Sequence, residues 1–246
     1  MERRAFVAGA TGLTGRFVVE YLIEAGIKVT AHIRPDSSRV DHWTRYFARL
    51  GADTSTVAWD QEEMMRALAS QAPEFVFGLL GTTKKRARSG GGDYQAVDYG
   101  LTAILIRALS DLEACRFVYL SAAGVTDDTQ NAYYKARAQV EKRLRNSDRT
   151  HLIARPSFIV GNRDESRPLE AMGAPVLDGM LGLVSLFGGR AWASRYRSMT
   201  GEELARGLGH AALTDCEGIL GVQELKRHAT LLAQWISSRD QETESA

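Results

Sequence analysis

Hydrophobic residues in this chain alternate between short continuous runs and stretches with a helical repeat. The first run, RAFVAGA at residues 4–10, predicts a buried strand. After it, apolar residues recur at the spacing of one helix face, at Phe17, Val18, Tyr21, Leu22 and Ala25. Gly26 follows at the position of a C-terminal helix stop. The chain therefore begins with a predicted strand and a predicted helix.

The same alternation continues to about residue 160. Further strands are predicted at residues 28–34, 54–60, 74–81, 116–122 and 151–160. Helices are predicted around residues 43–50, 61–71, 101–112 and 132–146. The run EFVFGLLG at 74–81 is apolar throughout, as in parallel strands that are buried on both faces. The pattern predicts an α/β protein with a Rossmann-like, doubly wound parallel sheet.

The 246 residues suffice for one α/β domain with a sizeable core. From about residue 162 the hydrophobic pattern is less regular, and further helices are predicted at 201–213 and 223–236. We interpret residues 1–240 as a single domain, with a substrate-side insertion at about 162–200. Residues 241–246 are predicted to form a disordered tail.

Composition and charge narrow the range of partners. The 31 Lys and Arg residues nearly balance the 30 Asp and Glu residues, so no charge excess suggests nucleic acid as a partner. No apolar run approaches the roughly 20 residues needed to span a bilayer. Too few apolar residues precede the first glycines for a secretory signal peptide. We therefore expect a cytoplasmic protein that acts on a small-molecule substrate. A homo-oligomer is compatible with the sequence but not indicated by it.

Cysteine and histidine usage gives no metal site. The two cysteines, Cys115 and Cys216, are isolated, which excludes a disulfide framework or a CxxC metal site and favours buried structural thiols. The five histidines are scattered without metal-ligand spacing. We expect no bound metal.

Three glycines, Gly9, Gly12 and Gly15, lie where the first strand should join the first helix. A helix N-terminus exposes unpaired N–H groups, and glycines let a phosphate approach them because no Cβ stands in the way. In a Rossmann fold the first glycine permits the turn, the second admits the pyrophosphate, and the third lets the helix pack closely against the strand. The alternative is a glycine-rich turn without a ligand. The context of strand, loop and helix favours a dinucleotide site. Its predicted contacts are Gly9, Thr11, Gly12, Leu13, Thr14 and Gly15.

The GATGLTG loop resembles that of the atypical and extended branches of the short-chain dehydrogenase/reductase superfamily. The segment FVYLSAAGV followed by YYKARAQVEKRL is similar to the family's fifth strand and active-site helix. The resemblance runs from residue 5 to about 165 and is closest to the small Tat-interacting-protein-like oxidoreductases. It implies a Rossmann fold and a nicotinamide cofactor.

The second predicted strand bears on the choice of cofactor. NAD sites usually end this strand with an acidic residue on the ribose 2′-hydroxyl, whereas arginine suits a 2′-phosphate. Here the strand ends in Arg34, and Ser38 and Arg39 can add donors. The sequence therefore favours NADP(H) over NAD(H). The alternative is that both arginines are solvated surface charges.

Other predicted cofactor contacts follow the carboxyl ends of later strands. Asp60 resembles the family residue near the adenine amino group, although a helix N-cap is an equally good reading of that residue. The remaining predicted contacts are Gly81, Thr82, Thr83, Arg155 and Pro156.

Short-chain dehydrogenases use a tyrosine as general acid–base, a lysine four residues later, and a serine or threonine on the fifth strand. A free phenol has a pKa of about 10, and a nearby cation lowers it. The resemblance places the tyrosine at Tyr133 and the serine at Ser121, and puts Arg137 where the lysine stands. Arginine keeps the charge but cannot share a proton as lysine does.

These residues predict an NADP(H)-dependent oxidoreductase that reduces a small carbonyl or quinone-like substrate. Tyr133 would supply the proton and Ser121 would orient the substrate oxygen. The alternative is a non-catalytic NADP(H)-binding redox sensor or scaffold protein. A nucleotide-sugar epimerase or dehydratase is less favoured, because about 80 residues after the sixth strand leave little room for a sugar-binding domain.

Overall fold

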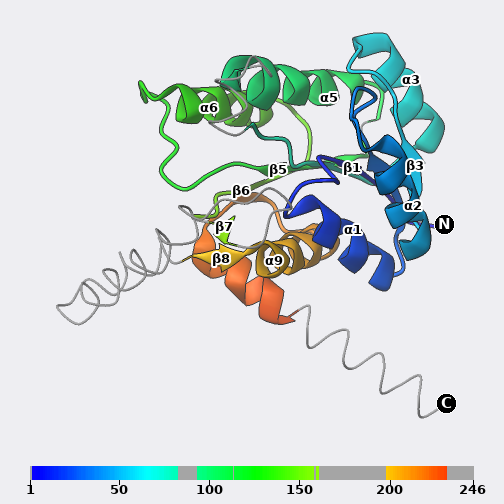
Figure 1. Ribbon diagram of the computed structural model, residues 1–246. Coiled ribbons are helices and arrows are strands. Elements are labelled where there is room, and N and C mark those ends of the chain that lie inside the picture. Colours follow the sequence, from blue (N-terminus) through cyan, green and yellow to red (C-terminus); the bar gives the residue numbers. More distant parts are fainter. Residues whose placement is uncertain (1, 83–92, 113, 158, 161–197, 232–246) are drawn as a thin grey trace.

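A seven-stranded parallel sheet forms the centre of the protein (Figure 1). The computed structural model describes residues 2–82, 93–112, 114–157, 159–160 and 198–231. The strand order is β3-β2-β1-β4-β5-β6-β9, so the order reverses between β1 and β4. The strands are β1 Arg4–Ala8, β2 Lys28–His32, β3 Asp53–Ser55, β4 Phe75–Gly78, β5 Arg116–Leu120, β6 His151–Ala154 and β9 Gly218–Leu220. This arrangement confirms the predicted doubly wound Rossmann-like sheet.

Helices cover both faces of the sheet (Figure 1). One face carries α1 Gly15–Glu24, α2 Val40–Leu50, α9 Gly201–Leu213 and the helical residues 222–231. The other face carries α3 Gln61–Gln71, α5 Thr102–Ala108 and α6 Ala132–Arg145. The chain enters α5 through a π-helical segment, η1 Gln95–Leu101.

Neighbouring residues of a strand enter different halves of the core. On β1, Val7 packs on the α1 side of the sheet while Phe6 packs on the α3 side. On β5, Val118 and Phe117 divide in the same way, and all four side chains are fully buried. Because both faces of the strands are covered by helices, the strands are apolar throughout rather than alternating. This is why continuous apolar runs were the correct indicator of the central strands.

The structure corrects several predicted boundaries. The strand predicted at 54–60 is only β3, and the residues after Ser55 form a loop. The strand predicted at 151–160 divides around Pro156, which has no N–H for a sheet. Its second part is β7 Ile159–Val160, which pairs in parallel with β8 Met199–Thr200. The short strands β8 and β9 were not predicted, because two or three residues carry too little pattern.

Much of the predicted substrate-side insertion lies outside the described residues, apart from 198–200, and the tail at 241–246 lies outside them as well. The division of the chain into one domain with an insertion therefore stays a prediction.

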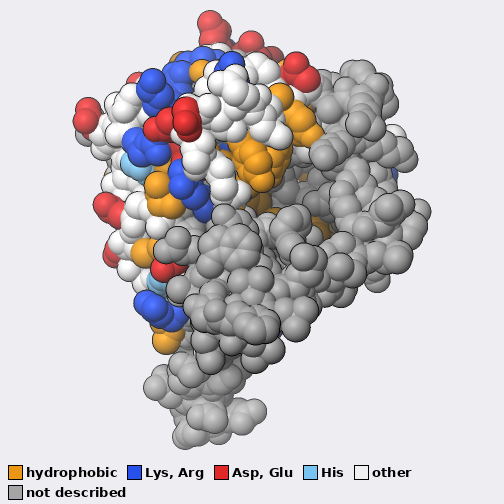
Figure 2. Space-filling view, turned by 90° about the vertical axis from the view of Figure 1, so that its left-hand side faces the viewer, with side chains coloured by type: hydrophobic (Ala, Val, Ile, Leu, Met, Phe, Trp, Pro, Cys, Tyr) orange, Lys and Arg blue, Asp and Glu red, His pale blue; other side chains and the backbone are white. Residues whose placement is uncertain are grey.

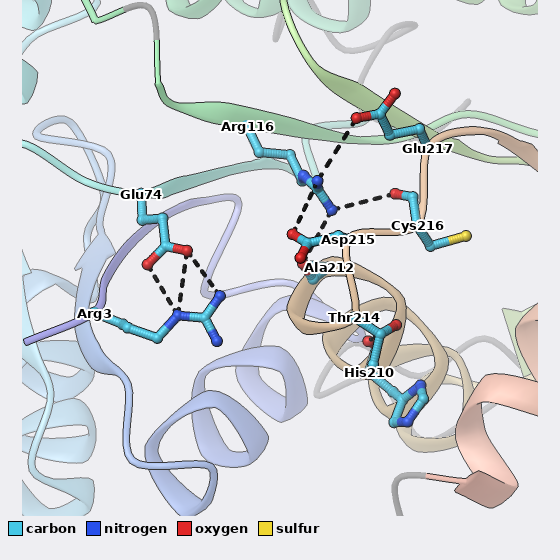
Figure 3. Close-up of polar contacts among 9 residues, drawn as sticks. All are labelled: Arg3, Glu74, Arg116, His210, Ala212, Thr214, Asp215, Cys216 and Glu217. Carbon is cyan, nitrogen blue, oxygen red and sulfur yellow. Dashed lines mark hydrogen bonds and ion pairs between the residues drawn. The ribbon is translucent and has the colours of Figure 1, made fainter.

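Arginine side chains tie the amino-terminal ends of the strands to their surroundings (Figure 3). Arg3, which precedes β1, donates to both carboxylate oxygens of Glu74, which precedes β4. Arg116 begins β5, donates to the carbonyls of Ala212 and Cys216, and forms an ion pair with Asp215 at 3.1 Å. These contacts lie at the edge of the sheet opposite the glycine loop. They therefore stabilise the sheet and its connections rather than contribute to a site at the glycine loop.

The described surface carries charges of both signs, and the described core holds one of the two cysteines. Basic and acidic side chains are interspersed on the described part of the face shown in Figure 2. Burial raises the pKa of the Cys115 thiol to about 12, which suits a structural thiol. Within the described ranges, no three His, Cys, Asp or Glu side chains are grouped to hold a metal. None of the helices described there has the length and apolar character to traverse a membrane.

Candidate functional site

The glycine loop joins β1 to α1 at the carboxyl edge of the sheet, beside the end of β4. Gly9 has a φ of +86°, and a Cβ there would lie 2.6 Å from the carbonyl oxygen of Leu79. A Cβ on Gly15 would lie 2.1 Å from the carbonyl oxygen of Gly9. Gly12 is different, because it is exposed and its Cβ would meet only the Gly9 oxygen at 3.1 Å. Turn and packing thus require Gly9 and Gly15, while Gly12 leaves open space in front of the loop.

The N-terminus of α1 has no side-chain cap. Thr14 occupies the N-cap position but makes no side-chain hydrogen bond to the helix. Helix α2 also has no side-chain cap, whereas Asp60, Asn131 and Thr200 cap α3, α6 and α9 with side-chain oxygens. An uncapped helix end with its N–H groups and positive dipole is suited to an anion.

The residues at this edge fit the pyrophosphate of a dinucleotide. Gly12 leaves room, the α1 N-terminus supplies N–H groups, and the strand order reverses here between β1 and β4. The Thr82 hydroxyl oxygen, just beyond β4, is buried and has no hydrogen-bond partner within the described part of the chain. Gly81 and Thr82 both lie at the predicted edge, whereas Thr83 lies outside the described residues. Contact of these residues with a cofactor stays a prediction.

Basic residues follow the end of β2, next to the loop. Arg34 is half-buried and its Nη1 lies 3.3 Å from Oδ2 of the exposed Asp36. The guanidinium of Arg39 lies over the Trp43 ring, 5.2 Å from its centroid. Ser38 is exposed beside them. An exposed ion pair such as Arg34–Asp36 contributes about 0–1 kcal/mol, so it leaves Arg34 able to exchange its partner for a phosphate.

Asp60 caps α3. Its Oδ1 accepts hydrogen bonds from the backbone N–H groups of Glu62 at 2.9 Å and Glu63 at 3.0 Å. These bonds, that from Glu63 foremost, lower the pKa of the Asp60 carboxyl. The N-cap interpretation therefore accounts for this carboxylate, and an adenine contact stays a prediction.

Tyr133 and Arg137 lie on one face of α6, as their spacing predicted. Asn131 caps this helix through hydrogen bonds from the N–H groups of Tyr133 and Tyr134. The Arg137 guanidinium lies 4.7 Å from the centroid of the half-buried Tyr133 ring. Lys135 is exposed and lies on a different face. The cation beside the candidate general acid is therefore Arg137.

A buried carboxylate holds that cation. Asp98, on η1, is 1% exposed, and its Oδ1 accepts from Arg137 Nη2 at 2.9 Å. Arg137 Nη1 also donates to the carbonyl of Leu120 at the end of β5. Asp98 Oδ2 accepts from the backbone N–H of Thr82 at 2.9 Å. One carboxylate thus links the loop after β4 to the arginine under Tyr133.

Burial raises the pKa of Asp98, while the charge of Arg137 and the N–H of Thr82 act in the opposite direction. The pair also explains Gly81, because a Cβ there would lie 3.1 Å from Arg137 Nη2. With its guanidinium bonded to Asp98 and Leu120 and 5% exposed, Arg137 is a fixed positive charge rather than a mobile ligand.

Ser121 lies at the end of β5, but its hydroxyl is committed. It donates to Oε1 of Glu141 at 2.5 Å, and both residues are buried. Arg155 holds the same carboxylate through Nε at 3.0 Å and Nη2 at 2.5 Å. An ionised carboxylate only accepts hydrogen bonds, so the Ser121 hydrogen points to Glu141. Ser121 can offer a substrate only an acceptor lone pair in this arrangement, and its catalytic role stays a prediction.

Arg155 and Pro156 lie beyond β6, as predicted for residues at the carboxyl edge. The Arg155 N–H donates to the carbonyl of Leu220, and the Pro156 carbonyl accepts from the N–H of Ala123 at 2.7 Å. These bonds fix the segments that flank the candidate site.

Sequence reasoning missed Asp98 and Glu141. The residues of α6 that face inward recur every four positions, at Tyr133, Arg137 and Glu141, which was a usable indication for Glu141. No comparable indication marked Asp98, because its partner Arg137 lies 39 residues away along the chain.

A family model described as NAD(P)H-binding matches residues 9–180. The chain belongs to this NAD(P)H-binding family. The match includes the glycine loop, β5 with the adjoining Ser121, and α6 with Tyr133 and Arg137. The resemblance to the atypical short-chain dehydrogenases/reductases is therefore confirmed as membership of an NAD(P)H-binding family. It does not distinguish NADP(H) from NAD(H).

The chain is similar to proteins named FMP52. It is 31% identical over 173 residues to protein fmp52-1, mitochondrial, of Aspergillus oryzae, covering 66% of this chain and 68% of that protein. It is 27% identical over 241 residues to protein FMP52, mitochondrial, of Saccharomyces cerevisiae, covering 95% and 93%. The expectation of a cytoplasmic location is contradicted by these relatives, which are named as mitochondrial proteins. Composition and a missing secretory pattern were insufficient grounds for it.

Solved structures share the fold. The Bordetella bronchiseptica enzyme WbmH in complex with NAD+ is 18% identical, with a TM-score of 0.61 over 92% of this chain and 80% of that one. A UDP-glucose 4-epimerase from Thermotoga maritima is 19% identical, with a TM-score of 0.62 over 95% and 82%. At these identities the likeness supports the architecture alone.

Proposed function

We propose that this protein is an NADP(H)-dependent oxidoreductase that reduces a small carbonyl or quinone-like substrate. The observation that carries the proposal is the position of Tyr133, a half-buried phenol stacked on the fixed cation of Arg137. Tyr133 stands at the start of α6, which follows β5 at the carboxyl edge where ligands of doubly wound sheets bind.

In this proposal, some residues of the chain bind the cofactor and others act on the substrate. The glycine loop and the α1 N-terminus would bind the pyrophosphate, and Arg34 would bind the 2′-phosphate. When bound, the reduced nicotinamide supplies a hydride. Tyr133 would give a proton to the substrate oxygen, so that hydride and proton together convert a carbonyl to an alcohol. Ser121 would act only as an acceptor, because its hydrogen is held by Glu141.

Tyr133→Phe tests the catalytic part of this proposal. The substitution keeps the ring on Arg137 but removes the proton, so NADPH oxidation should fall by about 10²-fold or more. Cofactor affinity should not change. Tyr134→Phe is the matched control, because it removes a neighbouring hydroxyl from the same helix turn. The measurement is steady-state NADPH oxidation over a panel of aldehydes, ketones and quinones. Full turnover in Tyr133→Phe would remove this tyrosine from the mechanism.

Arg34→Ala tests the choice of cofactor. Loss of a hydrogen bond to a charged group should weaken NADPH binding by about 1.5–3 kcal/mol and leave NADH binding nearly unchanged. Arg45→Ala is the control, because Arg45 is an exposed arginine on α2 that donates to the Asp41 carbonyl. Equal losses for NADPH and NADH would contradict the assignment of Arg34.

One observation favours the second candidate, an NADP(H)-binding protein without turnover. Both polar partners of a family-type site are engaged within the protein, Arg137 by Asp98 and Ser121 by Glu141. Cofactor binding by titration, with no NADPH oxidation by the wild-type protein on any member of the panel, would support this candidate over the enzyme.

A further inference from the structure

The first residue of α9 is a glycine without a conformational reason to be one. Gly201 begins the helix, and Thr200 caps it by accepting a hydrogen bond from the N–H of Glu203 at 2.9 Å. Gly201 is not among the glycines with positive φ, so its backbone would suit other residues. Glycine is also a poor helix former. The reason for glycine must therefore be space.

That space is taken by the dinucleotide-binding loop. A Cβ on Gly201 would lie 2.9 Å from Cγ of Leu13, 3.1 Å from its carbonyl oxygen and 3.4 Å from its carbonyl carbon. Leu13 stands between Gly12 and Thr14, at the approach to the α1 N-terminus. The start of α9 thus lies directly against the backbone of the loop.

Helix α9 has little freedom to retreat from this contact. On the side of α1, the Tyr21 hydroxyl donates to Glu202 at 2.7 Å and accepts from Arg206 Nε at 2.7 Å. On the side of the helical residues 222–231, a Cβ on Gly207 would lie 2.4 Å from the carbonyl oxygen of Leu225. The β7–β8 pair fixes the residues just before the helix. A side chain at position 201 would therefore displace Leu13 rather than α9.

We propose that Gly201 is a positioning residue for the dinucleotide-binding loop. Its bare backbone lets the loop sit at the depth at which the N–H groups around Leu13 and Thr14 point toward a pyrophosphate. The loop is then held from two directions, by Gly9 against the end of β4 and by Leu13 against α9. The inference rests on the proposed cofactor site, and it makes cofactor affinity a property of the C-terminal third as well as of the N-terminal motif.

Gly201→Ala is the direct test, with the dissociation constant of NADPH measured by fluorescence titration of the full chain. We expect at least tenfold weaker binding, while the thermal midpoint without cofactor changes little, because alanine favours the helix. Gly207→Ala is the matched control in the same helix. Its clash with Leu225 should lower the thermal midpoint without weakening NADPH binding in the folded protein. Leu13→Ala combined with Gly201→Ala should recover part of the affinity, since it removes the nearest atom.

The outcomes separate this inference from the proposed function. If the wild-type protein binds neither NADPH nor NADH, the cofactor site and the inference fall together. If the wild-type protein binds NADPH and Gly201→Ala binds it equally well, the inference alone is overturned. Should Gly201→Ala fail to fold, Leu13→Phe enlarges the same contact from the side of the loop, and wild-type affinity in that variant would overturn the inference equally.

Discussion

Asp98→Asn should reveal how much the protein depends on its buried ion pair. The side chains of Arg137 and Asp98 are 6% and 0% exposed, so water does not screen their interaction. Asparagine keeps the shape but removes the charge and replaces one acceptor oxygen by a donor, which then faces the Arg137 guanidinium or the Thr82 N–H. Removing one partner of a buried pair costs about 3–5 kcal/mol, because the other charge stays buried without compensation.

The matched control is Asp127→Asn. Asp127 forms an ion pair at 2.8 Å with Arg145, which lies on α6 as Arg137 does. The side chains of Asp127 and Arg145 are 69% and 34% exposed. Such a pair contributes about 0–1 kcal/mol. Replacing both buried partners, with Asp98→Leu and Arg137→Met, should recover most of the stability that Asp98→Asn loses, because no uncompensated charge remains.

The assay is equilibrium unfolding in urea, with the free energy of unfolding extrapolated to water. Asp98→Asn should lower that free energy by several times the effect of Asp127→Asn. NADPH binding should weaken as well, because Asp98 holds the Thr82 backbone beside the candidate site. A loss no larger than that of the exposed control would refute the assignment of Asp98 and Arg137 as a buried, mutually dependent pair.

Three further predictions follow from other contacts. His210 and His228 face each other with their Nδ1 atoms 2.8 Å apart, and burial lowers the pKa of both, helped at His210 by the charge of His228. Folded-state pKa values below the ordinary value of about 6.5 mean stability that is present above that pH and lost below it. The free energy of unfolding should therefore fall more between about pH 7 and 5 in the wild type than in His210→Asn/His228→Asn, and parallel curves would contradict this. Gly12→Val should abolish binding of both NADPH and NADH in a titration while circular dichroism shows the fold intact, and normal binding would mean that the phosphates lie elsewhere. Ser121→Ala should lower the free energy of unfolding by about 1–3 kcal/mol in urea, because Glu141 loses a buried donor; an unchanged value would mean that the hydroxyl is not engaged there.

The candidate site was predictable where its chemistry is local. Gly9, Gly12 and Gly15 fall within seven consecutive residues, and the turn they form depends on their own backbone and on the strand and helix beside them. The spacing of Tyr133 and Arg137 likewise fixed their common face of α6, because helical geometry alone decides it. The sheet could be predicted for the same reason, since runs buried on both faces leave a continuous apolar pattern. Location in the cell was not predictable from composition.

The partners of the site residues were decided by tertiary structure. Arg137 meets Asp98 only because α6 and η1 pack together, and Ser121 meets Glu141 only because α6 lies across the end of β5. Neither pairing has a spacing rule in the sequence. The contact of Gly201 with Leu13 joins two segments that are far apart in the sequence, and a glycine at the start of a helix gives no indication of it. The sequence by itself determined the glycine loop, the parallel pairing of the central strands and the face of α6 that carries Tyr133 and Arg137, because these depend on neighbours along the chain. Only the folded structure decided which charges are buried together and which backbones touch, because those depend on packing between distant segments.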